Sequence, residues 1–362
     1  MTEKDFQFKA AQQMPETGSA TWQSPSNIAL VKYWGKKDHQ IPANPSLSFT
    51  LNSCKTTTSL EFQKKTDRKL SNTFDFEFYF EGKKKEDFKP KIETFFKRIE
   101  EFCPYLKNYK LVIKSENSFP HSSGIASSAS GMSALALCVM SLEKELNPDI
   151  SEKYFNKKAS FLARLGSGSA CRSIEGPLIA WGTHKNIEGS SDLFGIKYPF
   201  VMHEVFNNYQ DTILLVDKGQ KQVSSSVGHN LMYGHPFADA RFEQAHTNLD
   251  KLQQVFENGD LENFISIVES EALTLHSMMM SSNPYFILMK PNTLEIINKI
   301  WEYREASKVP VCFTLDAGAN VHVLYPNQYK EEVLEFIKNE LIRFCEHEQY
   351  LCDEIGKGAK KL

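Results

Sequence analysis

The sequence predicts an α+β protein that is built from two domains or from one large domain. The chain has 362 residues, and a typical domain has roughly 150. Between Ala20 and about Val201, segments with the apolar pattern of strands come first and segments with helical periodicity come later. Hydrophobic residues make up 41% of the chain, so a large core can form and a disordered or collagen-like protein is excluded.

The first half of the chain contains the clearest strand pattern. The segment Phe74–Phe80, FDFEFYF, places Phe at every second position, which is the period of a half-buried strand. Leu111–Lys114 resembles a second strand. Between them, helical spacing relates Ile92, Phe95, Phe96, Ile99 and Phe102. We expect further helices over residues 126–146 and 151–165, with Ser151 as N-cap of the second, and then a strand over 177–182.

The polar segment 184–198 contains Gly and Ser and is the expected domain boundary. We place a flexible tail at residues 1–19, a first domain at 20–203 and a second domain at 204–362. In the second domain we expect strands over 212–217, 311–315 and 321–324, the last two forming a tight hairpin. Helices are expected over 239–257, 261–279 and 333–344. The helical spacing of Leu294, Ile297 and Trp301 predicts one more helix.

Charge and cysteine usage restrict the class of protein. The formal net charge of −3 provides no overall field that would attract nucleic acid or an anionic membrane. The N-terminus has no apolar segment of a signal peptide, and the uncharged segment 118–142 is too rich in Ser and Gly to span a bilayer. The seven cysteines are scattered without a CxxC pair, as expected for reduced thiols in the cytoplasm. No HExxH motif occurs, and we expect no transition metal held by the protein.

The segment Pro120–Ser130 combines Gly124 with several hydroxyl side chains and leads directly into the predicted helix over 126–146. Free backbone N–H groups and the positive end of the helix dipole favour an anion at such a place, and Gly124 lets a phosphate approach the backbone. The candidate ligands are Ser122, Gly124, Ser127, Ser128 and Ser130. The segment is not a Walker A loop, and a capping loop rich in Ser remains the alternative.

Two further segments contain cations among unusual neighbours. An apolar run ends in Lys32-Tyr33-Trp34-Gly35-Lys36, which places two ammonium groups beside aromatic rings at a strand end; the alternative is a solvated basic turn. In Gly166–Ser173, small residues including Ser167 and Ser169 surround Arg172, which suits recognition of a phosphate or carboxylate. The alternative there is a glycine turn with a surface arginine. Cys171 has no His near it in sequence and is disfavoured as a nucleophile.

Asp316 lies where a predicted strand meets a glycine turn, in Thr314-Leu-Asp316-Ala-Gly318. Taken alone, an Asp at such a position most often stabilises the turn through its own backbone.

Together these segments resemble the mevalonate diphosphate decarboxylase family of the GHMP kinase superfamily. The motifs PSNIALVKYWGK, ENSFPHSSGIASSASGMSALA, LARLGSGSACRSIEGPLIAW and FTLDAGANVHVL stand in the order of that family, and the resemblance extends from about Ala20 to Tyr325. It implies a GHMP fold, in which a ribosomal-S5-like N-terminal domain and a ferredoxin-like C-terminal domain enclose the active site. A homodimer is also implied.

The implied activity is the ATP-dependent decarboxylation of (R)-5-diphosphomevalonate to isopentenyl diphosphate in the mevalonate pathway of isoprenoid biosynthesis, with Mg²⁺ accompanying ATP. By motif position, Asp316 matches the base that deprotonates the 3-hydroxyl, and Lys32 matches the lysine that neutralises charge beside it. The residues from Ser122 to Ser130 match the ATP phosphate loop. The substrate segment is matched by Tyr33, Lys36, Ser167, Ser169, Arg172 and Ser225.

Two departures from the family pattern concern the substrate. The family often has VSS followed by Thr or Arg, one residue, Gly and Met, whereas this chain has Val223-Ser-Ser225-Ser-Val-Gly-His229. The phosphate loop has His121-Ser-Ser123 where Thr-Ala-Ala is common. The alternatives are therefore a decarboxylase or kinase of mevalonate 5-phosphate and, in another class, a nonenzymatic nucleotide sensor on a GHMP fold.

Overall fold

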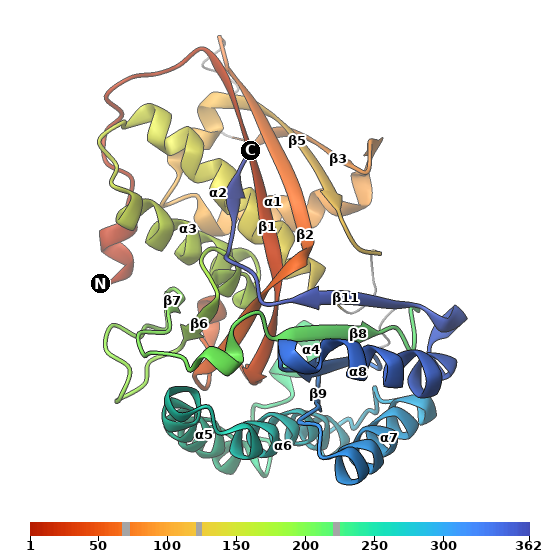
Figure 1. The fold of residues 1–362 in the computed structure, drawn as a ribbon. Coiled ribbons are helices and arrows are strands. Elements are labelled where there is room, and N and C mark those ends of the chain that lie inside the picture. The colour runs from red at the N-terminus through yellow and green to blue at the C-terminus, as the bar shows by residue number, and fades with distance from the viewer. Residues whose placement is uncertain (67–72, 121–124, 220–224) are drawn as a thin grey trace.

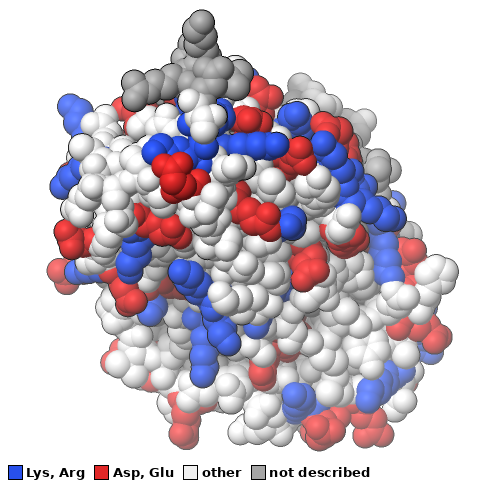
Figure 2. All heavy atoms as spheres, turned by 90° about the horizontal axis from the view of Figure 1, so that it is seen from above, with Lys and Arg blue, Asp and Glu red and all other residues white. Residues whose placement is uncertain are grey.

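The computed structural model describes residues 1–66, 73–120, 125–219 and 225–362, and only the backbone of Ser225 and Ser226. It contains two β-sheets, each covered by helices, so the α+β prediction is confirmed (Figure 1). On the face seen in Figure 2, basic and acidic side chains are interspersed, in keeping with the small net charge.

The first sheet has the strand order β12-β1-β2-β5-β3-β4, and β6 pairs with β2 and β7. Its strands are β1 (Thr17–Val31), β2 (Ser46–Lys64), β3 (Asp75–Phe80), β4 (Lys83–Lys84), β5 (Tyr109–Asn117), β6 (Leu178–Trp181), β7 (Ile196–Lys197) and β12 (Lys360–Lys361). The helices that pack with it are α1 (Lys89–Ile99), α2 (Ser127–Leu146) and α3 (Glu152–Gly166). Only β3 and β5 pair in parallel among the described strands.

The second sheet is antiparallel with the order β11-β8-β10-β9. Its strands are β8 (Gln210–Leu214), β9 (Cys312–Leu315), β10 (Val321–Tyr325) and β11 (Tyr350–Glu354). The helices of this half are α4 (Ser225–Asn230), α5 (Ala238–Asn258), α6 (Leu261–Met280), α7 (Pro291–Ser307) and α8 (Lys330–Phe336), the last continuing as irregular helical turns to Phe344.

The end of β1 is enclosed by elements from both halves of the chain. Every residue from Ser24 to Val31 is buried. Helix α2 packs on this strand, and so do α5 and α6 from the second half (Figure 1). One hydrophobic cluster accordingly joins Ile28 and Leu30 to Leu249 and Phe264. Lys32, which directly follows this strand, therefore lies in the protein interior.

The predicted elements agree with the structure in most places. The strand expected over 212–217 ends at Leu214, the helix expected over 333–344 is an α-helix only to Phe336, and one helix face differs. The strand over 74–80 is β3, and the helix over 151–165 is α3, where the Ser151 hydroxyl accepts the backbone N–H of Tyr154. The predicted stripe does lie on a helix, α7, but only Ile297 of its three residues is buried, because Leu294 and Trp301 are 48% and 38% exposed. The helix instead buries Ile296, Ile297 and Ile300.

The two chain ends differ from the expected layout. Residues 1–19 were expected to be a mobile tail, but Phe6 is fully buried and its ring lies 4.4 Å from that of Phe161. At the other end, β12 pairs with β1, so the last residues return to the first sheet. The boundary at residue 203 stays a prediction.

Residues 127–142 of the uncharged segment lie in α2, whose side chains are mostly buried. In the described part of the chain, no helix combines the length and apolar character required to cross a membrane. All seven cysteines are free thiols.

Candidate functional site

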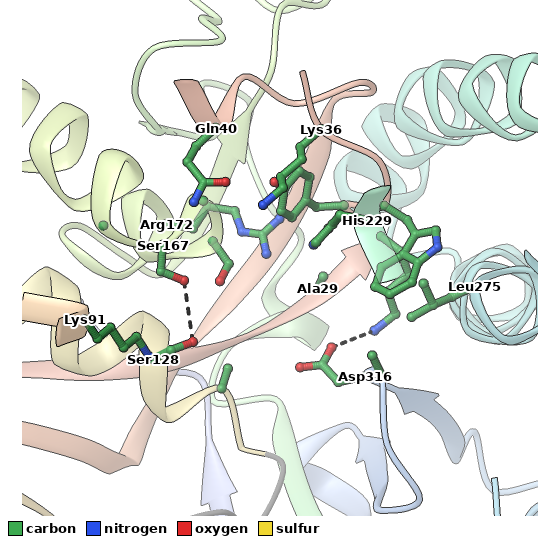
Figure 3. A pocket seen from close by; sticks show the side chains of 18 residues that line it. Ala29, Lys36, Gln40, Lys91, Ser128, Ser167, Arg172, His229, Leu275 and Asp316 are labelled. Carbon is green, nitrogen blue, oxygen red and sulfur yellow. Dashed lines mark hydrogen bonds and ion pairs between the residues drawn. The ribbon is translucent and has the colours of Figure 1, made fainter. Parts of the chain in front are cut away.

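A cavity of about 320 Å³ lies where β1 ends, α2 begins and the β9–β10 hairpin turns (Figure 3). Eight of the predicted site residues line it: Lys32, Tyr33, Lys36, Ser128, Ser167, Ser169, Arg172 and Asp316. They come from four separate segments of the sequence. The fold therefore brings the four motifs together at one place.

Lys32 and Asp316 form an ion pair in this cavity. The Nζ atom of Lys32 lies 3.5 Å from Oδ1 of Asp316 (Figure 3). Lys32 follows the buried end of β1 and is 1% exposed, whereas the Asp316 side chain follows β9 and is 28% exposed. Burial lowers the pKa of Lys32, and the negative charges of Asp316 and Glu271 partly oppose this.

Arg172 is buried, so the alternative of a surface arginine is wrong. Its Nη1 donates to the Ser46 hydroxyl at 2.6 Å and its Nε donates to Oδ1 of Asn27 at 3.3 Å. These bonds hold the guanidinium group over the Trp181 ring, with its Cζ atom 5.8 Å from the ring centroid. Within the described structure Nη2 makes no hydrogen bond, and this end of the group is available to an anion in the cavity.

We expect Arg172→Lys to raise the KM for the anionic substrate by about 10-fold or more while the protein stays folded. Lysine keeps the charge, but its donors all lie on one nitrogen, which cannot reach Ser46, Asn27 and an anion in the cavity together as the planar guanidinium can. Steady-state titration of the substrate at saturating ATP measures this effect. Arg343→Lys, in an exposed pair with Glu340, is the matched control. An unchanged KM in Arg172→Lys would show that Arg172 only supports the fold.

The start of α2 faces the same cavity. Its N-cap, Ala126, has a left-handed backbone (φ 39°) and no side chain that can cap the helix. The first backbone N–H groups of a helix lack partners inside the helix, and together with the helix dipole they favour an anion. The Ser128 hydroxyl reaches toward this region, 3.5 Å from the hydroxyl of Ser167 (Figure 3).

The other serines of this segment have different surroundings. Ser130 was expected to bind the phosphates, but it is fully buried and its hydroxyl bonds to that of Thr56 at 2.6 Å. It therefore does not reach the cavity. Ser127 lines an adjoining cavity of about 80 Å³. Ser122 and Gly124 lie outside the described residues, and so does the side chain of Ser225.

We expect Ser128→Ala to weaken binding of ATP about 3- to 10-fold, which corresponds to loss of one hydrogen bond of roughly 1 kcal/mol. Binding of the second substrate should change less, because we expect Arg172, and not Ser128, to hold it. Separate titrations of the two ligands measure the difference. Ser277→Ala, an exposed serine on α6, is the control. An unchanged ATP constant would remove Ser128 from the nucleotide site.

Sequence reasoning missed His229 as a cavity residue, although its position was noted as a departure from the family pattern. The His229 ring centroid lies 4.2 Å from that of Tyr33 and 4.6 Å from that of Trp34. Its Nδ1 accepts the backbone N–H of Gly35 at 3.0 Å, which places the ring proton on Nε2. Burial, with the charges of Lys36 and Arg172, lowers the pKa of His229 to about 3. The ring is therefore neutral near pH 7.

Gln40 and Lys91 also line the cavity, and no motif in the sequence singled them out. Lys36 is half-buried, and burial together with the charge of Arg98 lowers its pKa. Together with Lys32 and Arg172, the two lysines Lys36 and Lys91 make the cavity strongly cationic. The site is thus suited to a ligand with several negative charges.

The fold and the site define a class of protein: an α+β protein of GHMP kinase fold with a cationic cavity, suited to polyanionic ligands, next to a Lys–Asp pair. Residues 24–193 match the model of the diphosphomevalonate decarboxylase-like N-terminal domain, and residues 212–359 match that of the mevalonate 5-diphosphate decarboxylase C-terminal domain. The chain belongs to the diphosphomevalonate decarboxylase family.

Individual relatives agree with this assignment. The diphosphomevalonate decarboxylase of Debaryomyces hansenii is 30% identical over 338 residues, which cover 89% of this chain and 82% of that protein. A solved complex of MDDEF with MVAPP, AMPPCP and magnesium is 28% identical with a TM-score of 0.80, covering 96% of this chain and 99% of the other. The mevalonate diphosphate decarboxylase from Enterococcus faecalis is 27% identical with a TM-score of 0.79 and the same coverage.

Proposed function

We propose that the protein catalyses the ATP-dependent decarboxylation of (R)-5-diphosphomevalonate to isopentenyl diphosphate, with release of ADP, phosphate and CO2. The observation that carries this proposal is the Lys32–Asp316 pair, which faces Arg172 and the start of α2 inside one cavity. A site for two polyanions next to a carboxylate suits phosphoryl transfer to a hydroxyl group. The membership of the chain in the decarboxylase family identifies the acceptor.

The first chemical step is activation of the tertiary 3-hydroxyl, which is a poor leaving group. The Asp316 carboxylate accepts the hydroxyl proton while the oxygen attacks the γ-phosphorus of ATP, and ADP leaves. Lys32 holds the carboxylate by its ion pair and offsets the negative charge that gathers at the transferring phosphoryl group.

The second step breaks two bonds together. The C–C bond to the carboxylate breaks and its electron pair forms the new C=C bond, as the bond from carbon to the phosphorylated oxygen breaks. CO2 and phosphate leave. Arg172 and Lys32 stabilise the departing phosphate, because both are buried cations in the cavity.

The two substrates occupy different parts of the site. We assign Tyr33, Lys36, Ser167, Ser169, Arg172 and Ser225 to diphosphomevalonate. We assign the start of α2 with Ser128, together with Ser122 and Gly124 of the sequence that precedes it, to the ATP phosphates. The adjoining cavity shares Ser128 and Lys91 with the first and is lined by Phe78, Phe80 and Phe88. Such an aromatic pocket beside a phosphate site suits the nucleobase.

The residues also fit a magnesium ion that arrives with the nucleotide. Across the described residues no group of three or more His, Cys, Asp or Glu could hold a metal ion. Mg²⁺ is commonly bound by one or two carboxylates together with substrate phosphates and water, so such a group is not required. Asp316 is the carboxylate that lines the cavity, and the ion would shield the charge of the phosphates there.

One assay separates the proposed function from its alternatives. The purified protein is supplied with ATP and Mg²⁺ and with mevalonate, its 5-phosphate or its 5-diphosphate, and ADP and CO2 are measured independently. We expect both products only with the diphosphate. Both products with the monophosphate would indicate the alternative decarboxylase, and ADP alone would indicate a kinase. Nucleotide binding without either product would indicate a sensor.

We further propose a cytoplasmic homodimer. The family resemblance supports the dimer, and the seven free thiols support a reducing compartment. Sedimentation equilibrium of the purified protein tests the dimer, for which we expect a mass of twice 41.3 kDa.

A further inference from the structure

We propose that helix α6 positions both members of the Lys32–Asp316 pair, through Glu271, which holds the backbone of Lys32, and His276, which holds the backbone of Asp316. The inference rests on the proposed function in so far as Lys32 and Asp316 carry out its chemistry. Neither Glu271 nor His276 lines the cavity, whereas Leu275 of the same helix does. They are positioning residues and not catalytic ones.

The contact to Lys32 involves both of its backbone groups. The Lys32 N–H donates to Oε2 of Glu271 at 2.8 Å, and the Lys32 carbonyl accepts from Nη2 of Arg241 at 3.0 Å. Arg241 comes from α5 and also donates to both carboxylate oxygens of Glu271, at 3.0 and 2.5 Å. Asn248 donates to Oε1 of Glu271 at 2.7 Å. Since β1 ends at Val31, these side chains bind Lys32 where the strand pairing stops.

The buried Arg241–Glu271 pair is costly for a purely structural element. Both side chains are fully buried, and removing two charges from water costs free energy that a hydrophobic pair of similar volume would not. Nε of Arg241 has no hydrogen-bond partner in the described structure, which adds to the cost. A function that needs the charge explains the pair better than stability does.

The electrostatic effect of Glu271 supports this function. The charged groups around the Lys32 ammonium are Asp316 from the β9–β10 turn, Glu271 from α6 and Arg172 from the turn Gly168–Ser173, with Arg241 of α5 on its backbone. Glu271 raises the pKa of Lys32 against the effect of burial. The carboxylate therefore helps to keep the ammonium charged as well as in place.

The contact to Asp316 uses the other residue. Nε2 of His276 lies 3.1 Å from the carbonyl oxygen of Asp316, and because a carbonyl only accepts, Nε2 carries the proton. Burial lowers the pKa of His276 to about 4. The charge of Lys32 acts in the same direction, and Asp316 opposes it. The ring is therefore neutral near pH 7. The same carbonyl accepts the N–H of Gly318 at 2.7 Å. Glu271 and His276 are five positions apart on one rigid helix, about 7.5 Å along its axis, which fixes the distance between the two residues they hold.

The test compares variants of these two residues with a matched buried pair elsewhere. We expect Glu271→Gln to lower kcat about 10- to 100-fold with KM values within about 2-fold of the parent, because the reacting groups and not the binding groups move. The alkaline limb of kcat/KM should shift to lower pH, since a charge that raises the pKa of Lys32 is lost. His276→Leu should lower kcat similarly, and His276→Gln, which can still donate to the Asp316 carbonyl, should restore most of it.

The control is Glu143→Gln, which breaks a second buried ion pair, between Lys158 of α3 and Glu143 of α2. It should lower the melting temperature and leave kcat and the pH profile unchanged. Parent kcat in Glu271→Gln and in His276→Leu, or no rescue by His276→Gln, would overturn the proposal. If Glu271→Gln does not fold, the two His276 variants decide alone. Absence of turnover in the parent would instead contradict the proposed function, so the two failures are distinct.

Discussion

Asp316→Asn is expected to fold, to bind ATP and diphosphomevalonate, and to lose about 10²- to 10⁴-fold in kcat, the usual cost of removing a general base. Asparagine keeps the shape of the side chain, and its amide oxygen can still accept a hydrogen bond from Lys32. It cannot accept the proton of the 3-hydroxyl. Because phosphorylation precedes decarboxylation, formation of ADP and release of CO2 should fall together.

Independent measurement of ADP and CO2 checks this, with ligand binding followed by titration. Asp217→Asn is the matched control, since Asp217 also follows a strand and accepts the N–H of Gly219 at 2.7 Å, and it does not line the cavity. Turnover near the parent rate in Asp316→Asn would end the mechanism. ADP without CO2 would assign Asp316 to the second step.

The anion-binding character of the site could be predicted from short motifs, because each motif combines residue types that need special surroundings. The reaction itself followed only from the resemblance of these motifs to the family. A lone Arg among small residues, as at Arg172, and aromatic residues between two lysines, as in Lys32–Lys36, are unusual on a solvated surface. Their burial could not be predicted locally. Lys32 is enclosed because α5 and α6 pack on β1, and its partner Asp316 lies 284 positions away.

The misses have physical causes of the same kind. Periodicity shows that a segment is helical but does not fix which side faces the core. The stripe through Leu294 and Trp301 has correct helical spacing, yet α7 is rotated so that Ile296 and Ile300 are buried instead. Ser130 was likewise assigned to the phosphate site, but it lies on the side of α2 that packs against Thr56. Glu271 and His276 stand in no motif, since their role depends on contacts between distant segments.

Lys32→Met is expected to reduce kcat about 10²- to 10³-fold, the range seen when one group that stabilises developing charge is removed. Methionine is unbranched and flexible, so it can occupy the buried channel of the lysine side chain without its charge. Lys32→Arg keeps a charge but places it differently, and we expect an intermediate rate. Pre-steady-state formation of ADP measures the loss in the phosphoryl-transfer step directly.

The pH dependence provides a second and independent check on Lys32. Burial lowers its pKa below the ordinary value of 10.5, so the ammonium is present at low pH and is lost as the pH rises through the lowered value. The parent profile of kcat/KM, which reports the free enzyme, should therefore fall on the alkaline side below pH 10.5. In Lys32→Arg this limb should move to higher pH, because a guanidinium stays protonated. If Lys32→Arg and the parent lose activity at the same pH, a group other than Lys32 sets the limb and its charge is not what the reaction requires.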